Sequence, residues 1–170
     1  MSQDVNNHSE VIIIGSGATA LAIVHCLAKI GMRPKVVSHG GSDIATYSRF
    51  CDTLSSPVSI HNGEEFLSWL LGCLEGDKRC FLIPESDSAR LFLAEYRGRL
   101  SESVYSWGGS FDDMRDLIEK DRLYKKAEDN GIPVPQCFKG DTVSELSEWL
   151  DDVPGPYFAK PFYSADPNHL

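Results

Sequence analysis

The chain has 170 residues, 25 acidic against 16 basic side chains, and a formal net charge of −9. This length suits one domain, or one domain and part of a second, and 42% hydrophobic with 24% charged residues is typical of a folded globular protein. Neither half of the sequence carries a basic excess, which disfavours nucleic acid as a partner. The apolar runs, such as residues 11–14, are too short to cross a membrane, so we expect no membrane partner.

The cysteines disfavour both a disulfide framework and a metal site. There are five, an odd number, and they are widely spaced with no CxxC pair: Cys26, Cys51, Cys73, Cys80 and Cys137. We therefore expect free thiols, a cytoplasmic protein and no metal ligands in this set.

The first 110 residues alternate strand and helix patterns. Residues 1–9 are polar, and we expect a disordered leader there. The expected elements are a strand at 10–15, a helix that ends at Gly31, strands at 35–38 and 80–84, a helix at 64–74, and a helix that begins after the capping residues 86–88. This alternation predicts an α/β fold with a Rossmann-like parallel sheet over residues 10–110.

A glycine loop joins the first strand to the first helix. Its spacing, Gly15-x-Gly17-x-x-Ala20, matches the dinucleotide fingerprint, in which helix N–H groups face a phosphate. The acid that should hold a ribose about 20 residues later is absent, since the next acid is Asp43, whereas Arg49 could supply the cation that NADP needs. Three interpretations stay open here: an NAD(P) or FAD site, a tight turn without a nucleotide, and part of a substrate site.

The composition changes after residues 108–109, and residues 111–163 form the second expected region. Residues 111–130 have a helical pattern, 132–135 must be extended because of their prolines, and 143–150 form a short acidic helix. Residues 156–161 are expected to be a strand, and residues 164–170 a loose tail.

Several segments occur in a characteristic order. They are DRLYKKA at 121–127, NGIPVP at 130–135 and PYFAKP at 156–161, preceded by YSRFC at 47–51 and IPESD at 83–87. Together they resemble the ATP-grasp enzymes, specifically carboxylate–amine ligases and carbamoyl-phosphate-synthase-like proteins, over roughly residues 10–163. The resemblance implies a Rossmann-like pre-ATP-grasp domain followed by an incomplete ATP-grasp subdomain.

The resemblance also implies a chemistry. These ligases use ATP and Mg²⁺ to convert a small carboxylate into an acylphosphate, which an amine-type nucleophile then attacks. The residues that match nucleotide-binding positions are Arg122 and Lys160, and those that match the substrate-side cleft are Gly15, Ser16, Gly17 and Asp87. No catalytic residue is assigned, and the magnesium ligands are expected downstream of Leu170.

Other interpretations remain for these residues and for the whole chain. Arg122 also suits a salt-bridged helix start, and Asp87 suits a helix cap. Because the later parts of an ATP-grasp site are missing, we expect the 170 residues alone to be inactive, as the N-terminal portion of a longer ligase. The alternatives are a non-catalytic nucleotide-binding or scaffold domain and an NAD(P)- or FAD-binding oxidoreductase module.

The second region also lacks partners for its apolar residues. These are Ile132, Val134, Phe138, Tyr157 and Phe158. We expect them to be covered by another copy, in a homodimer, or to lie in a partly disordered segment.

Overall fold

The computed structural model describes residues 9–38, 43–74, 78–138, 140–153 and 155–158. Most of the expected leader, the whole of the expected tail and Lys160 lie outside these ranges. The chain divides into two compact units, Met1–Arg115 and Asp116–Leu170. The helices of the described ranges lack the length and apolar character that a membrane span would need.

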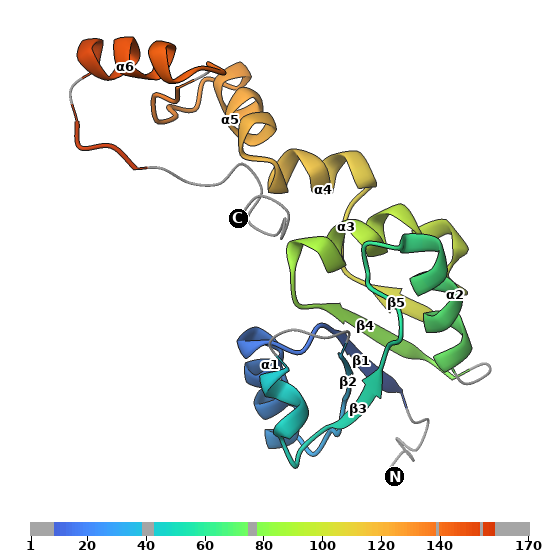
Figure 1. The fold of residues 1–170 in the computed structure, drawn as a ribbon. Coiled ribbons are helices and arrows are strands. Elements are labelled where there is room, and N and C mark those ends of the chain that lie inside the picture. The colour runs from blue at the N-terminus through green and yellow to red at the C-terminus, as the bar shows by residue number, and fades with distance from the viewer. Residues whose placement is uncertain (1–8, 39–42, 75–77, 139, 154, 159–170) are drawn as a thin grey trace. The chain divides into compact units, whose positions relative to one another are not determined.

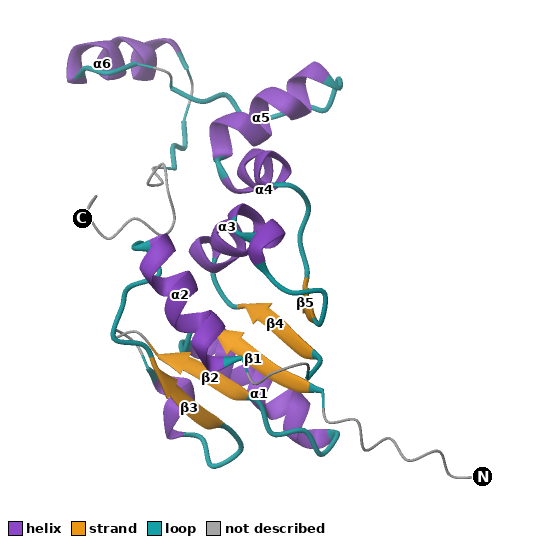
Figure 2. Cartoon of the chain, turned by 90° about the vertical axis from the view of Figure 1, so that its right-hand side faces the viewer, coloured by secondary structure: helices purple, strands orange, loops and turns teal. Residues whose placement is uncertain are grey.

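The first unit is built on a parallel sheet of five strands (Figures 1 and 2). In chain order they are β1 Glu10–Ile14, β2 Lys35–Ser38, β3 Asp52–Ser55, β4 Cys80–Pro84 and β5 Val104–Ser106. Their order in the sheet is β3-β2-β1-β4-β5, so the chain winds outward in one direction from β1 and then in the other from β4. The α/β, Rossmann-like prediction is confirmed, although β3 and β5 were not expected.

Helices cover both faces of this sheet (Figure 1). Helix α1, Ala18–Lys29, lies on one face with the 3-10 turn η1, Ile44–Tyr47. Helices α2, Gly63–Cys73, and α3, Asp87–Glu95, lie on the other face, and the turn η2, Arg97–Arg99, follows α3.

The central strand β1 is apolar over residues 11–14 because these residues are buried from both sides. Ile12 and Ile14 pack in one core cluster with Phe66 of α2 and Phe92 of α3, whereas the neighbouring Ile13 packs in the other cluster, with α1. These three isoleucines are 0% exposed, since alternate residues of a strand face opposite sides of the sheet. The carboxyl end of β1, where the glycine loop begins, is therefore packed firmly from both sides.

The remaining helices are α4 Phe111–Ile118, α5 Lys120–Asp129 and α6 Val143–Asp152. The single helix expected over 111–130 is wrong in detail, because Glu119 adopts an extended conformation and separates α4 from α5. Thr142 begins α6 with a capping box, in which its hydroxyl accepts from the Glu145 N–H. The strand expected at 156–161 is not formed at residues 156–158, and its remainder lies outside the described part of the chain.

Candidate functional site

The candidate site lies where β1 and β4 end, at the carboxyl edge of the sheet. Ile14 and Pro84 are paired in register, and the Glu85 N–H donates to the Ile14 carbonyl at 3.1 Å. This is the point at which the winding direction reverses, and open α/β sheets bind their ligands there. The residues that follow the two strands, 15–17 and 85–87, are therefore neighbours although they are far apart in sequence.

The carboxylate of Glu85 occupies the glycine loop. The Gly17 N–H donates to Glu85 Oε2 at 3.3 Å. A Cβ atom added to Gly17 would lie 2.6 Å from Glu85 Oε1, and one added to Gly15 would overlap Oε2. Gly15 also has φ +119°, a conformation that side chains other than glycine rarely adopt. Both glycines thus make room for an acidic side chain of the protein itself.

Ser16, between the two glycines, is engaged by the loop after β2. Its hydroxyl donates to the Asp43 carboxylate, and its carbonyl accepts from the Ala45 N–H at 2.9 Å. The residue is only 5% exposed. Ser16 therefore lies at the carboxyl edge of the sheet, as expected, but its side chain connects the glycine loop to the start of η1.

Asp87 lies at the same edge, in the first turn of α3. The N-cap of this helix is Ser86, whose hydroxyl accepts from the Ala89 N–H at 3.2 Å. Asp87 is thus not the cap, and its carboxylate pairs with Arg90 at 3.5 Å. A carboxylate in the first turn is favoured by the positive end of the helix dipole.

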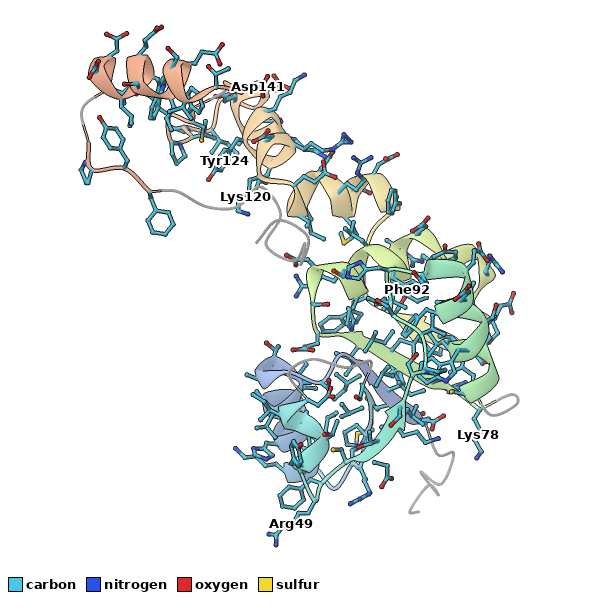
Figure 3. All side chains as sticks on the ribbon, viewed as in Figure 1. Arg49, Lys78, Phe92, Lys120, Tyr124 and Asp141 are labelled. Atoms are coloured by element: carbon cyan, nitrogen blue, oxygen red, sulfur yellow. The ribbon has the colours of Figure 1, made fainter. Side chains whose placement is uncertain are left out.

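The structure does not support the dinucleotide interpretation of the glycine loop. A negative side chain already accepts from the Gly17 N–H, which is the group that a pyrophosphate would use. Arg49, the cation considered for NADP, precedes β3, and its carbonyl accepts from the Arg33 guanidinium at 2.6 Å just before β2 begins. It therefore lies at the amino edge of the sheet, opposite the glycine loop, and extends away from the fold (Figure 3).

Arg122 lies in the first turn of α5, in a cluster of ion pairs within the second unit. Its Nε is 3.1 Å from Asp116 Oδ1 and 3.6 Å from Glu119 Oε2. Lys126 Nζ lies 3.0 Å from Asp116 Oδ2. The hydrogen bond from Lys126, and secondarily the charge of Arg122, lower the pKa of Asp116. This environment matches the salt-bridged helix start that the sequence also allowed, and both Arg122 contacts use Nε.

Neither a metal site nor the second expected nucleotide residue can be built from the described residues. Within the described ranges, no three His, Cys, Asp or Glu side chains are grouped so as to hold a metal ion. The chain segment with Lys160 lies outside those ranges. The described residues therefore do not fit a magnesium ion.

No protein-family model and no curated relative matches the sequence. Solved structures do match. The N5-carboxyaminoimidazole ribonucleotide synthetase of Thermus thermophilus is 16% identical, with a TM-score of 0.53 over 86% of this chain and 37% of that one. The carboxyaminoimidazole ribonucleotide synthase of Aspergillus clavatus, complexed with ATP, is 15% identical, with a TM-score of 0.59 over 86% and 36%.

A third matching structure belongs to a different enzyme. It is the biotin carboxylase domain dimer of the Hydrogenobacter thermophilus 2-oxoglutarate carboxylase with MgADP, ADP and bicarbonate, 12% identical, with a TM-score of 0.56 over 86% of this chain and 33% of that one. The chain has the fold of the N-terminal part of ATP-grasp carboxylate–amine ligases. It spans about a third of the length of these structures. At such identities the ATP-grasp likeness establishes the fold alone.

The glycines at this edge could be identified from the sequence, but the acidic residues that contact the glycine loop could not. Glu85 and Asp43 were present in the sequence without an assigned role. Their signal was positional: each follows a strand of the parallel sheet, β4 or β2, and such strands end at the same edge. Glu85 lies directly after β4, and its proximity to Gly17 depends on β4 pairing with β1.

Proposed function

We propose that the chain is the N-terminal part of an ATP-grasp ligase that activates a small carboxylate as an acylphosphate for attack by an amine-type nucleophile. The observation that carries the proposal is the fold shared with three enzymes, each over 86% of this chain, together with the ordered motifs around Arg122 and residues 130–135. The first unit would contribute the substrate-side cleft through Gly15, Ser16, Gly17 and Asp87.

In this proposal the second unit contributes the first contacts to the nucleotide. Asp116 and Glu119 hold the Arg122 guanidinium through Nε, which fixes its direction. A guanidinium suits phosphate oxygens because its terminal nitrogens donate in a planar fork. Lys160 would supply a second cation. ATP, when bound, supplies the phosphoryl group, and the two cations would offset its negative charge.

ATP binding by the full chain tests this role. Equilibrium dialysis with labelled ATP is expected to show about tenfold weaker binding for Arg122→Ala and for Lys160→Ala, the loss of one charge-assisted hydrogen bond each. Lys125→Ala is the matched control, because it removes one positive charge from the same helix at an exposed position. No steady release of phosphate is expected from the chain alone with carboxylate and amine substrates. Equal effects of Arg122→Ala and Lys125→Ala would contradict the assignment.

The ion pairs of Arg122 favour one alternative, a non-catalytic scaffold that keeps the fold. In that case the guanidinium serves the helix start and has no ligand. The same dialysis experiment distinguishes the ligase from the scaffold. For a scaffold of this kind, neither the wild type nor Lys125→Ala would bind ATP.

We also propose a cytoplasmic location, supported by the state of the cysteines. The five thiols are free in the structure. Burial raises the pKa of the Cys80 thiol to about 12, so this thiol stays protonated and unreactive inside the core. Such packing of reduced cysteines is usual in a reducing compartment.

A further inference from the structure

We propose that Glu85 is a specificity-determining residue that closes the glycine loop to phosphate groups by occupying it with its own carboxylate. A glycine loop before a helix is a ready anion site, because its N–H groups are unpaired and the helix dipole is positive there. In this chain the anion is part of the protein. The inference rests on the first unit alone and does not depend on the proposed ligase function.

The backbone holds Glu85 in place beside the loop. Its N–H donates to the Ile14 carbonyl at 3.1 Å, which continues the pairing of β4 with β1 by one residue. The residues on either side are also fixed, since Pro84 ends β4 and Ser86 caps α3. The side chain of Glu85 therefore starts from a rigid position next to Gly15.

The side chain then fills the space that the glycines leave. Oε2 accepts from the Gly17 N–H at 3.3 Å, and the two carboxylate oxygens occupy the positions where Cβ atoms of residues 15 and 17 would extend. The sequence has the fingerprint of a phosphate loop, but the Glu85 side chain fills the space inside that loop and accepts from one of its N–H donors. An incoming phosphate would have to displace Glu85.

A second acidic group contacts the loop. The carboxylate of Asp43 accepts from the Ser16 hydroxyl, between the two glycines. A phosphate that displaced Glu85 would thus remain close to another negative charge, which disfavours its binding. The charge of Asp87, at the same edge, is offset by its ion pair with Arg90.

Backbone amide NMR of the full ¹⁵N-labelled chain, titrated with inorganic pyrophosphate, tests the proposal. In the wild type we expect the amides of residues 15–18 to show no saturable shift. In Glu85→Ala the same amides should shift saturably, with apparent affinity at least about tenfold above the wild type. Glu85→Gln removes the charge but keeps the size, so it serves if the alanine variant fails to fold, and we expect an effect smaller than that of alanine.

Glu95→Gln is the matched control. It also removes one negative charge, but at the exposed last residue of α3, whereas Glu85 contacts the loop glycines. We expect this variant to behave as the wild type does. Three results would overturn the proposal: saturable pyrophosphate binding at residues 15–18 of the wild type, an equal gain in Glu95→Gln, or no gain in folded Glu85→Ala and Glu85→Gln.

Discussion

At the scale of single residues, Gly15 and Gly17 are glycines for different reasons. Gly15 has φ +119°, and an added Cβ would meet both the carboxylate and the Cβ of Glu85. Gly17 would meet mainly Glu85 Oε1, the far end of a flexible side chain. The first requirement comes from the backbone, whereas the second comes from the position of one movable group.

This difference predicts two distinct costs on substitution. Gly15→Ala should lower the free energy of unfolding by roughly 1–3 kcal/mol, because the backbone strain stays whatever Glu85 does. Gly17→Ala should cost less than about 1 kcal/mol, since Glu85 can move and only its hydrogen bond is lost. Urea unfolding of both variants, alone and combined with Glu85→Ala, measures the costs.

The combined variants separate strain from crowding. The cost of Gly17→Ala should disappear in the Glu85→Ala background, whereas most of the cost of Gly15→Ala should remain. Equal rescue of both substitutions would show that Gly15 is required only for space and that its conformation carries no penalty.

At the scale of elements, the strands that are buried on both faces could be predicted from the sequence, whereas a strand that forms through pairing with its neighbour could not. Strands β1 and β4 have continuous apolar runs because helices cover both faces of the sheet. Strand β3, with the sequence DTLS, is largely exposed and has no such pattern, and it forms because it pairs with β2 at the sheet edge. The break at Glu119 was also missed, since both helices around it have helical composition.

The candidate site divides in the same way. Gly15 and Gly17 could be found from local spacing, because the fingerprint is contained in six residues. Glu85 is 68 residues from Gly17 along the chain, and nothing local indicates that the two meet. Only the strand order places β4 beside β1, and strand order is a property of the whole sheet.

Arg33 stabilises the pairing of β2 with β3 at the start of the two strands. Its Nε and Nη2 donate to Asp52 Oδ1 at 2.9 and 2.8 Å, and Nη2 also donates to the Cys51 carbonyl at 2.9 Å. The hydrogen bond from Arg33 is the main cause that lowers the pKa of Asp52 below its ordinary value of 3.8. An edge strand with polar side chains is thus connected to its neighbour by a guanidinium.

This ion pair predicts a small dependence of stability on pH. Because the folded-state pKa of Asp52 is depressed, its contribution is complete above the unfolded pKa and is lost as the pH falls through the folded value. As the pH falls below about 5, the free energy of unfolding should therefore decrease slightly less for Asp52→Asn than for the wild type. Urea unfolding midpoints measured at several pH values check this. Both side chains are more than half exposed, so the effect should be modest and should shrink in high salt. Parallel pH profiles for the two proteins would contradict this reasoning.

At the scale of the whole molecule, the two units differ in how they bury apolar surface. The first has a core on each face of its sheet. In the second, the ring of Trp149 on α6 lies 6.0 Å from that of Phe138 and 5.9 Å from that of Tyr157. Large apolar side chains there remain exposed: Ile132 by 58%, Tyr157 by 48% and Phe158 by 81%. The second unit has less internal packing with which to resist local opening.

Amide hydrogen exchange should report this difference. Amides of β1, β2 and β4 should exchange most slowly, because they lie in the buried centre of the sheet, whereas amides of residues 134–138 should exchange fast in dilute solution. If another copy covers the exposed side chains, protection across residues 132–158 should rise with protein concentration, in step with the mass measured by sedimentation. Uniform protection of this segment in a monomer would contradict the expectation, since it would mean that the unit is closed by contacts of its own.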